Sequence, residues 1–220
     1  MALIDLHDET ASYGGTAILR GITLRIEPGE RVAVVGESGA GKSTLLRLAY
    51  ERCRNGAALV PQELGLVQSL TVFHNVYMGR LHRHSAWRNL RNLVRPAAEE
   101  VRNVGAVLSR LRLEDKLFTT VGELSGGQQQ RTAVGRALYH PGDILIADEP
   151  VSAVDEHQAQ EILETMNGEK RTVVLAMHDR ALAIAFADRL VGLRNGRIVL
   201  DEPAAGMKPG DLDHLYRPAG

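Results

Sequence analysis

The stretch "RVAVVGESGAGKST" (Arg31–Thr44) decides which fold this chain adopts. Its first five residues are almost continuously apolar and rich in valine, which is typical of a strand buried on both faces of a parallel sheet. A glycine-rich turn follows at once, and "STLLRLAYE" then has the pattern of a helix. A strand, a glycine-rich turn and a helix in this order are the context in which a P-loop works. The sequence therefore predicts an α/β fold that binds a nucleoside triphosphate.

The loop residues are suited to holding phosphate groups. Glycine permits unusual backbone angles that let backbone amides approach phosphate oxygens, and the start of the helix adds a partial positive charge. Lys42 can reach the β- and γ-phosphates, the Ser43 hydroxyl can ligate Mg²⁺, and Thr44 can support the α-phosphate. The residues predicted to contact the nucleotide through this loop are Gly36, Glu37, Ser38, Gly39, Ala40, Gly41, Lys42, Ser43 and Thr44.

Two further apolar runs end in polar residues that suit the same site. "DILIADEP" ends a buried strand with Asp148, whose carboxylate would lie at the carboxyl edge of the sheet and could hold Mg²⁺ through water. The next residue, Glu149, could orient or deprotonate a water molecule at the γ-phosphate. "TVVLAMH" ends in His178, which could hydrogen-bond to the γ-phosphate from the same edge. These residues predict that Lys42, Glu149 and His178 act in catalysis.

Composition limits the other classes of protein that this chain could belong to. The 26 basic and 27 acidic residues leave it almost neutral, so its overall charge does not indicate binding to nucleic acid or to a membrane surface. Cys53 is the only cysteine, which excludes an intrachain disulfide and suits a reducing compartment. "MALIDLHDET" lacks the features of a secretory signal, and no window is apolar enough for a membrane-spanning helix. We therefore expect a cytosolic protein that reaches a membrane only through another protein.

The rest of the chain divides into a sheet-based core and a helical insertion. "ALIDLHD" and "ITLRIE" alternate apolar and polar residues, which predicts half-exposed strands of an antiparallel layer. "DRLVGL" and "RIVL", joined by the turn "RNG", predict a late pair of strands. The apolar residues expected to share one face of the first inserted helix are Phe73, Val76, Tyr77 and Leu81. We expect residues 1–64 and 141–220 to form the nucleotide-binding core and residues 65–140 to form a helical subdomain.

A second potential anion site lies in "LSGGQQQR" (Leu124–Arg131). Ser125 can cap a helix whose first free amides belong to Gly126 and Gly127, but no lysine or metal ligand accompanies them. Alone, this site should bind phosphate weakly. If it met a γ-phosphate already held by another subunit, it could complete the electrostatic stabilisation that the transition state needs.

The order of these motifs resembles that of the ATP-binding cassette (ABC) ATPases over nearly the whole chain. A P-loop is followed by "LSGGQ", then by the "ADEP" strand, then by a histidine at the end of a strand. The resemblance implies a P-loop NTPase core like that of RecA, with ATP and Mg²⁺ as its ligands. It also implies that two cassettes stack head to tail as a homodimer. In such a dimer Ser125, Gly126, Gly127 and Gln128 would act in trans on the ATP of the partner.

Other positions match motifs of the same family. Gln62 in "LVPQ" corresponds to a glutamine that is thought to touch Mg²⁺ and the attacking water, which implies a catalytic and a metal-binding role. Asp155 in "SAVD" corresponds to a residue that sets the geometry across the dimer interface. Tyr13 stands where the family has an aromatic residue that stacks on adenine, and a tyrosine packed in the core is the alternative. The metal ligands implied in this way are Ser43, Gln62 and Asp148.

The sequence departs from the family pattern between Lys42 and Gln62. The bridge "LAYERCRNGAALVPQ" is shorter than in most relatives, and the strands usually inserted there are largely missing. We therefore expect a reduced antiparallel β layer. All the residues expected to act in catalysis survive this shortening, so ATP hydrolysis is still expected.

Within the insertion, "LTVFHNVYMGRLHRHSAWRNL" resembles the ATPase subunits of phosphonate importers, and so does the end "DLDHLYRP". This resemblance implies a subunit that couples ATP-driven dimerisation to the uptake of phosphonate or a related phosphorus oxyanion through a membrane permease. A solute-binding protein would take part indirectly. The subunit would lie peripherally at the cytoplasmic face of the plasma membrane.

A basic segment in the insertion indicates where a partner could bind. Between Leu64 and Ala98 there are five arginines and no Asp or Glu. Such a patch could meet a permease, anionic lipid headgroups or nucleic acid phosphates, and we favour the permease. The alternatives for the whole chain are an ABC ATPase of a lipoprotein-release or cell-division complex, or a soluble ABC ATPase that acts on nucleic acid. Nucleic acid is not the expected partner, because the chain lacks a second fused cassette and a long coiled-coil insertion.

Overall fold

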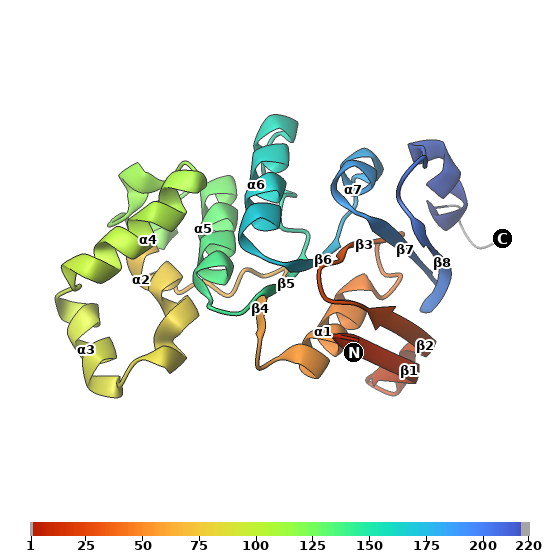
Figure 1. The fold of residues 1–220 in the computed structure, drawn as a ribbon, viewed down its shortest axis with the longest axis horizontal. Coiled ribbons are helices and arrows are strands. Elements are labelled where there is room, and N and C mark those ends of the chain that lie inside the picture. The colour runs from red at the N-terminus through yellow and green to blue at the C-terminus, as the bar shows by residue number, and fades with distance from the viewer. Residues whose placement is uncertain (1, 217–220) are drawn as a thin grey trace.

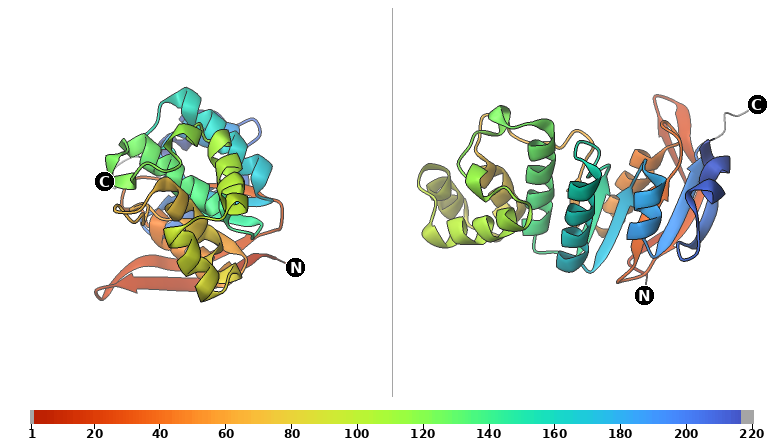
Figure 2. Two further views of the ribbon diagram at one scale, coloured as in Figure 1. Left: turned by 90° about the vertical axis from the view of Figure 1, so that its left-hand side faces the viewer. Right: turned by 90° about the horizontal axis from the view of Figure 1, so that it is seen from above.

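The chain folds around a central sheet, with a lobe of helices at one end (Figure 1). The computed structural model describes residues 2–216. Turned views show that the lobe extends the molecule along its longest axis (Figure 2). Within the described residues, none of the helices combines the length and the apolar character that crossing a bilayer requires.

The central sheet has six strands in the order β4-β5-β6-β3-β7-β8. Pairing is parallel from β4 to β7 and antiparallel between β7 and β8. The strands are β3 (Arg31–Val35), β4 (Ala57–Val60), β5 (Ile144–Asp148), β6 (Thr172–Ala176), β7 (Arg189–Arg194) and β8 (Arg197–Pro203). Every residue of β5 and β6 is buried, as expected for parallel strands that are covered on both faces. The parallel core and the late antiparallel pair predicted from the sequence are therefore confirmed.

The two faces of the sheet belong to two separate hydrophobic clusters. Because side chains alternate along a strand, Ala33 and Val35 pack on one side while Val32 and Val34 pack on the other. The first side is covered by the helices α5 (Gly126–Tyr139), α6 (Glu156–Glu169) and α7 (Arg180–Phe186). The second side is covered by α1 (Lys42–Cys53) and by a hairpin of two strands.

That hairpin is the antiparallel layer expected from the sequence, and it has two strands. They are β1 (Ile4–Tyr13) and β2 (Thr16–Ile26), joined by a turn at Gly14 and Gly15, both with positive φ. The buried residues alternate along the strands, as a half-exposed sheet requires. After α1 the chain needs only residues 54–56 to enter β4, so the described structure has no strand between them. The reduced layer predicted from the short bridge is present.

Every named element between Val72 and Tyr139 is a helix. Before α5 they are α2 (Val72–Tyr77), η1 (Met78–Arg83), α3 (Ala86–Val94), α4 (Ala98–Arg110), η2 (Glu114–Lys116) and η3 (Val121–Glu123). They enclose a third hydrophobic cluster centred on Phe73, Val76 and Leu108. After β8 the described chain ends in η4 (Pro209–Tyr216). A helical subdomain over residues 65–140 agrees with this arrangement, and its boundaries stay a prediction.

The expected apolar face of the first inserted helix is only partly correct. Phe73, Val76 and Tyr77 are buried, but Leu81 is exposed. The α-helix ends at Tyr77 and continues as the 3-10 helix η1, which turns by a different angle per residue. The α-helical spacing used in the prediction therefore fails for Leu81.

A buried carboxylate holds the lobe together. Glu100, in the first turn of α4, accepts hydrogen bonds from the Tyr139 hydroxyl at 2.6 Å and from the Arg88 guanidinium at 2.7 Å. Burial raises the pKa of Glu100, but the hydrogen bonds from Tyr139 and Arg88 outweigh it and leave that pKa below its usual value. The ionised carboxylate therefore joins α3, α4 and α5.

This network predicts a pH-dependent loss of stability in the variant Glu100→Gln. At neutral pH we expect a loss of about 1–2 kcal/mol, because the Arg88 guanidinium loses its anionic partner. Since folding depresses the pKa of Glu100, its ionic contribution is present above the unfolded value and is lost as the pH falls through the folded value. The difference between the two proteins should shrink on acidification, as measured by urea unfolding. Glu99→Gln, at an exposed carboxylate 3.8 Å from Arg88, is the control. A difference that does not change with pH would contradict this account.

Candidate nucleotide-binding site

The loop between β3 and α1 has the backbone geometry of a phosphate cradle. Gly36, Gly39 and Gly41 all have positive φ. A side chain at Gly36 would overlap the carbonyl of Leu193, so only glycine fits there. α1 begins after Gly41 without any side-chain cap. Its first amides are therefore available to an anion, which the helix start also favours electrostatically.

Lys42 lies buried within this loop. Its ammonium group donates hydrogen bonds to the carbonyls of Gly36 at 2.8 Å and Glu37 at 3.0 Å. Burial lowers the pKa of Lys42, while the negative charges of Glu149 and Asp148 oppose that effect. The loop thus holds a cation at its centre, with carbonyl partners that a phosphate oxygen could replace.

Asp148 and Ser43 form a pair that fits a divalent cation. Asp148 ends β5 and is buried. Burial raises the pKa of Asp148, and a hydrogen bond with Ser43 partly offsets this. One carboxylate oxygen, Oδ1, is buried and has no hydrogen-bond partner among the described residues. A hydroxyl and an unsatisfied carboxylate oxygen are ligands that Mg²⁺ accepts. Gln62, the third ligand implied by the sequence, lines the same cavity of about 690 Å³.

The side chains of Glu149 and His178 are in contact at the same edge of the sheet. Glu149 Oε1 and His178 Nε2 lie 2.7 Å apart. Glu149 has a φ of 53°, an unusual value for a residue other than glycine, and its amide donates to the carbonyl of Ala176 at 3.1 Å. This turn brings the Glu149 side chain to the site, whereas a continuing strand would point it to the opposite face from Asp148. Such outliers cluster at functional sites.

One cavity of about 680 Å³ collects most of the predicted residues. Its lining includes Tyr13, Ser38, Gly39, Gly41, Lys42, Ser43, Thr44, Gln62, Glu149 and His178. Gly36, Glu37 and Ala40 are not part of the lining and lie in the loop behind it, where Gly36 and Glu37 provide the carbonyls for Lys42. Tyr13 is 85% exposed, so the alternative that it packs in the core is wrong. Its ring is free to act as the base platform that the resemblance implies.

The second anion site does not join this cavity. Ser125 caps α5: its hydroxyl accepts from the Gln128 amide at 3.3 Å, and the Gln128 side chain accepts from the Ser125 amide at 3.0 Å. Ser125 and Gly126 are exposed. None of the residues Ser125, Gly126, Gly127 and Gln128 lines the cavity around the P-loop. Within one chain, the two phosphate sites are therefore separate.

Asp155 has a clear structural task. It caps α6, because its carboxylate accepts from the Gln158 amide at 2.9 Å. A role at a dimer interface stays a prediction for this residue.

Sequence reasoning missed Gln130, which connects α5 with the turn that follows β5. This buried residue of α5 donates to the carbonyl of Glu149 at 2.7 Å, and its oxygen accepts from the Ala153 amide at 2.9 Å. It therefore fixes the turn that carries Glu149 to the helix that begins at Ser125. The run of three glutamines after Gly127 was the available signal, but the sequence shows neither the burial of the third one nor its contacts.

The comparisons with known proteins agree with this geometry. The family model described as "ABC transporter" matches residues 19–152. The "Phosphonates import ATP-binding protein PhnC" of Pseudomonas putida is 37% identical over 98% of this chain and 90% of its own length. The relative with the same name in Anaeromyxobacter dehalogenans is 40% identical over 93% of this chain, which spans only 46% of that protein. The dimeric ATP-binding cassette MJ0796 bound to ADP and Pi has a TM-score of 0.78 and 27% identity, over 93% of this chain and 100% of that one.

The unsatisfied oxygen of Asp148 predicts opposite effects of Asp148→Asn with and without ligands. Without ligands, the variant should gain about 1 kcal/mol of stability, because it no longer buries an incompletely paired charge. With ATP, the additional rise in melting temperature caused by Mg²⁺ should disappear, since an amide is a poorer ligand. Differential scanning fluorimetry measures both effects. Asp143→Asn, at the exposed residue directly before β5, is the control. An unchanged Mg²⁺ effect in Asp148→Asn would exclude Asp148 as a ligand.

Proposed function

This chain belongs to the ABC transporter family, and we propose that it is the ATP-hydrolysing subunit of an importer for phosphonate or a related phosphorus oxyanion. The observation that carries the ATPase assignment is the cavity in which Lys42, Glu149 and His178 meet the P-loop amides. The cargo is inferred from relatives that are named for phosphonate import and cover nearly the whole chain.

The residues divide the work of ATP hydrolysis among them. The loop amides and Lys42 bind the phosphates, and Tyr13 provides a flat surface for the adenine. Ser43, Asp148 and Gln62 would hold Mg²⁺, which when bound neutralises charge on the phosphate oxygens. Glu149 orients the attacking water and accepts its proton. In this structure the His178 ring contacts the Glu149 carboxylate. Once ATP is bound, the same ring can donate a hydrogen bond to the γ-phosphate.

The separate site at Ser125 supports hydrolysis by a dimer. A homodimer stacked head to tail would place Ser125, Gly126, Gly127 and Gln128 against the γ-phosphate of the partner. The backbone amides of Gly126 and Gly127 would donate hydrogen bonds to the negative charge that develops in the transition state, where such donors have the most effect. Solved cassettes similar to this chain are dimeric, which agrees with this arrangement. Asp155, which caps α6 shortly after the turn of Glu149, would lie near the interface.

A groove between the core and the lobe suits a membrane permease. The cavity there has a volume of about 520 Å³ and is lined by residues of α1, β4, η1 and α5. Among them Arg54 and Arg136 provide positive charge. A permease that inserts a segment here would contact both parts of the cassette and respond when ATP closes them. We therefore place the subunit at the cytoplasmic face of the plasma membrane, with the solute-binding protein acting through the permease.

Another membrane complex is the second candidate, since the cassette geometry alone does not select a cargo. Cassettes that serve lipoprotein release or cell division would use the same ATP site. Co-purification of the full chain from its own cells separates these functions. A permease and increased uptake of phosphonate support the proposal, whereas recovery with another membrane complex or with nucleic acid would overturn the importer assignment.

The variant Glu149→Gln tests the proposed base. It should bind ATP as tightly as the original protein, because Glu149 is not needed to hold the phosphates. Hydrolysis should slow by at least about a hundredfold. Size-exclusion chromatography with ATP should show a dimer that persists, and phosphate release measures turnover. Glu51→Gln, an exposed residue at the rim of the same cavity, is the control. Normal turnover in Glu149→Gln would remove this role from the residue.

The variant Ser125→Arg tests whether the site is shared. A bulky cation at the exposed start of α5 should block contact with a partner's γ-phosphate. ATP binding at the variant's own P-loop should be unchanged, while hydrolysis should fall by about a hundredfold or more. Mixing this variant with a Lys42→Ala variant should restore part of the activity, because one complete composite site forms in the mixed dimer. Retained hydrolysis in Ser125→Arg alone would refute the shared site.

A further inference from the structure

The helix α3 is oriented with its apolar residues toward the solvent. Trp87 is 77% exposed and Val94 is 83% exposed, and Leu90 and Leu93 are also exposed. Trp87, Leu90 and Val94 have the spacing of one helical face. The buried residue of this helix is polar, since Asn92 is completely enclosed. We call Trp87, Leu90, Leu93 and Val94 the outer face of α3.

Hydrogen bonds fix this orientation. Asn92 donates to the Tyr77 hydroxyl at 2.8 Å and accepts from the Ala97 amide at 2.9 Å. The Tyr77 hydroxyl in turn donates to Asn89 at 2.9 Å. Arg88 completes the set by binding the buried Glu100. A rotation of α3 that hid its apolar residues would break this whole network and leave its buried polar groups unsatisfied. The outer face is therefore a stable feature of the fold.

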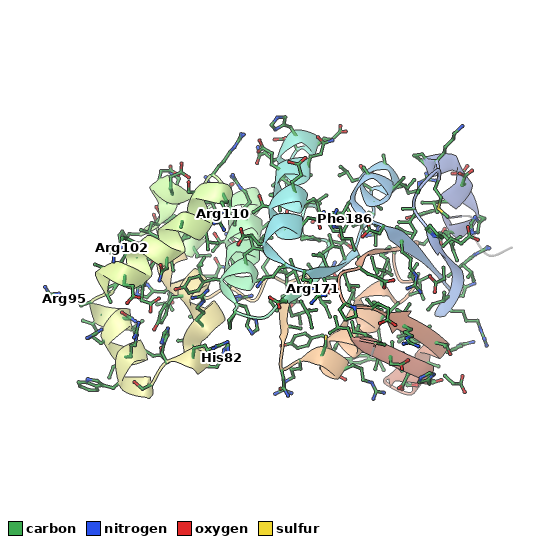
Figure 3. All side chains as sticks on the ribbon, in the orientation of Figure 1. His82, Arg95, Arg102, Arg110, Arg171 and Phe186 are labelled. Atoms are coloured by element: carbon green, nitrogen blue, oxygen red, sulfur yellow. The ribbon has the colours of Figure 1, made fainter. Side chains whose placement is uncertain are left out.

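Exposed arginines precede α3, lie within it and follow it along the chain. Arg83, Arg91 and Arg95 are exposed and form no ion pair within the described residues, unlike Arg88. Arg95 points away from the lobe at the far end of the molecule (Figure 3). No Asp or Glu occurs between Leu64 and Ala98. The first acidic residues after it, Glu99 and Glu100, pair with Arg88 and with none of the other three arginines.

We propose that the outer face of α3 binds the surface of an anionic membrane. A short helix that presents tryptophan and aliphatic side chains with flanking arginines has the composition of a helix lying in a lipid interface. Anionic headgroups would pair with Arg83, Arg91 and Arg95, and the apolar side chains would enter the boundary with the acyl chains. Nucleic acid would leave these apolar side chains in water.

The position of α3 favours a lipid surface over a protein groove. The helix lies at the tip of the lobe, at one end of the longest axis of the molecule (Figures 1 and 2). A projecting ridge meets a flat surface readily, whereas the groove proposed for the permease lies between η1 and α5. The contact would hold the lobe close to the membrane in addition to any permease. This proposal needs only lipid and does not depend on the proposed import function.

The experiment uses the purified full chain and lipid vesicles. Trp87 is the only tryptophan, so its fluorescence reports directly on the outer face. With vesicles of equal parts phosphatidylcholine and phosphatidylglycerol, the emission should shift to the blue and the protein should sediment with the vesicles. With phosphatidylcholine alone, both signals should be absent. High salt should release the protein, because screening weakens the attraction to the headgroups.

Two variants separate charge from apolar contact. The triple variant Arg83→Gln, Arg91→Gln and Arg95→Gln should bind roughly a hundredfold more weakly, since each arginine near an anionic surface contributes about a factor of five. The double variant Leu90→Ser and Val94→Ser should bind about tenfold more weakly at unchanged charge. The matched controls alter exposed positions outside the lobe: Arg20→Gln, Arg171→Gln and Arg197→Gln together, and Val199→Ser alone.

Several outcomes would overturn the proposal. Binding that is equal for both vesicle types, or that the control variants weaken as much, would show that the outer face is not the contact. A failure to bind the anionic vesicles would also contradict the proposal. If Leu90→Ser and Val94→Ser instead dissolved a dimer in the absence of lipid, the outer face would be an interface between copies. Melting temperatures and the ATPase activity of all variants should stay unchanged, because these side chains are exposed and distant from the ATP site.

Discussion

The hydrogen bonds of Gln130 to the turn after Asp148 are the constraint on which the site depends. The turn would otherwise be unfavourable, because Glu149 adopts a left-handed backbone conformation that costs of the order of 1 kcal/mol. The Gln130 side chain hydrogen-bonds to the carbonyl of Glu149 and to the amide of Ala153. The carbonyl at the end of β6 accepts a hydrogen bond from the amide of Glu149. With the turn fixed at these points, two consecutive carboxylates can serve different tasks. Asp148 meets Ser43 inside the site, and Glu149 meets His178.

The same glutamine links the helix that carries the second anion site to the turn that carries Glu149. α5 contributes to the hydrophobic cluster of the core through Ala133 and Ala137, and to that of the lobe through Tyr139. It begins at the anion site of Ser125 and contacts Glu149 one turn later. In the proposed dimer, the helix that meets a partner's phosphate at Ser125 would also hold the turn of the base through Gln130.

The sequence predicts the core of this protein well because its signals there are local. A valine-rich run followed by "GESGAGKST" determines a strand, a loop and a helix, and the ends of β5 and β6 then place Asp148, Glu149 and His178 at one edge. The short bridge before Gln62 likewise predicts a reduced antiparallel layer, and the layer observed has two strands. The errors arise where tertiary contacts decide. Leu81 is exposed because the helix changes type after Tyr77, and Gln130 is missed because its partners are far away in the sequence.

α3 shows most clearly why periodicity alone is insufficient. Its apolar residues recur with helical spacing, so a rule that buries the apolar face would place Trp87, Leu90 and Val94 inside. Burying such a side chain stabilises a fold by about 1.5–3 kcal/mol, and this fold leaves these side chains exposed instead. It does so because Asn89, Asn92 and Arg88 complete a polar network around Tyr77 and Glu100, and an unsatisfied buried member of that network would cost a comparable amount. Periodicity reveals that a helix has two faces. Which face is buried depends on the side chains that the lobe places against it, here Tyr77 and Glu100.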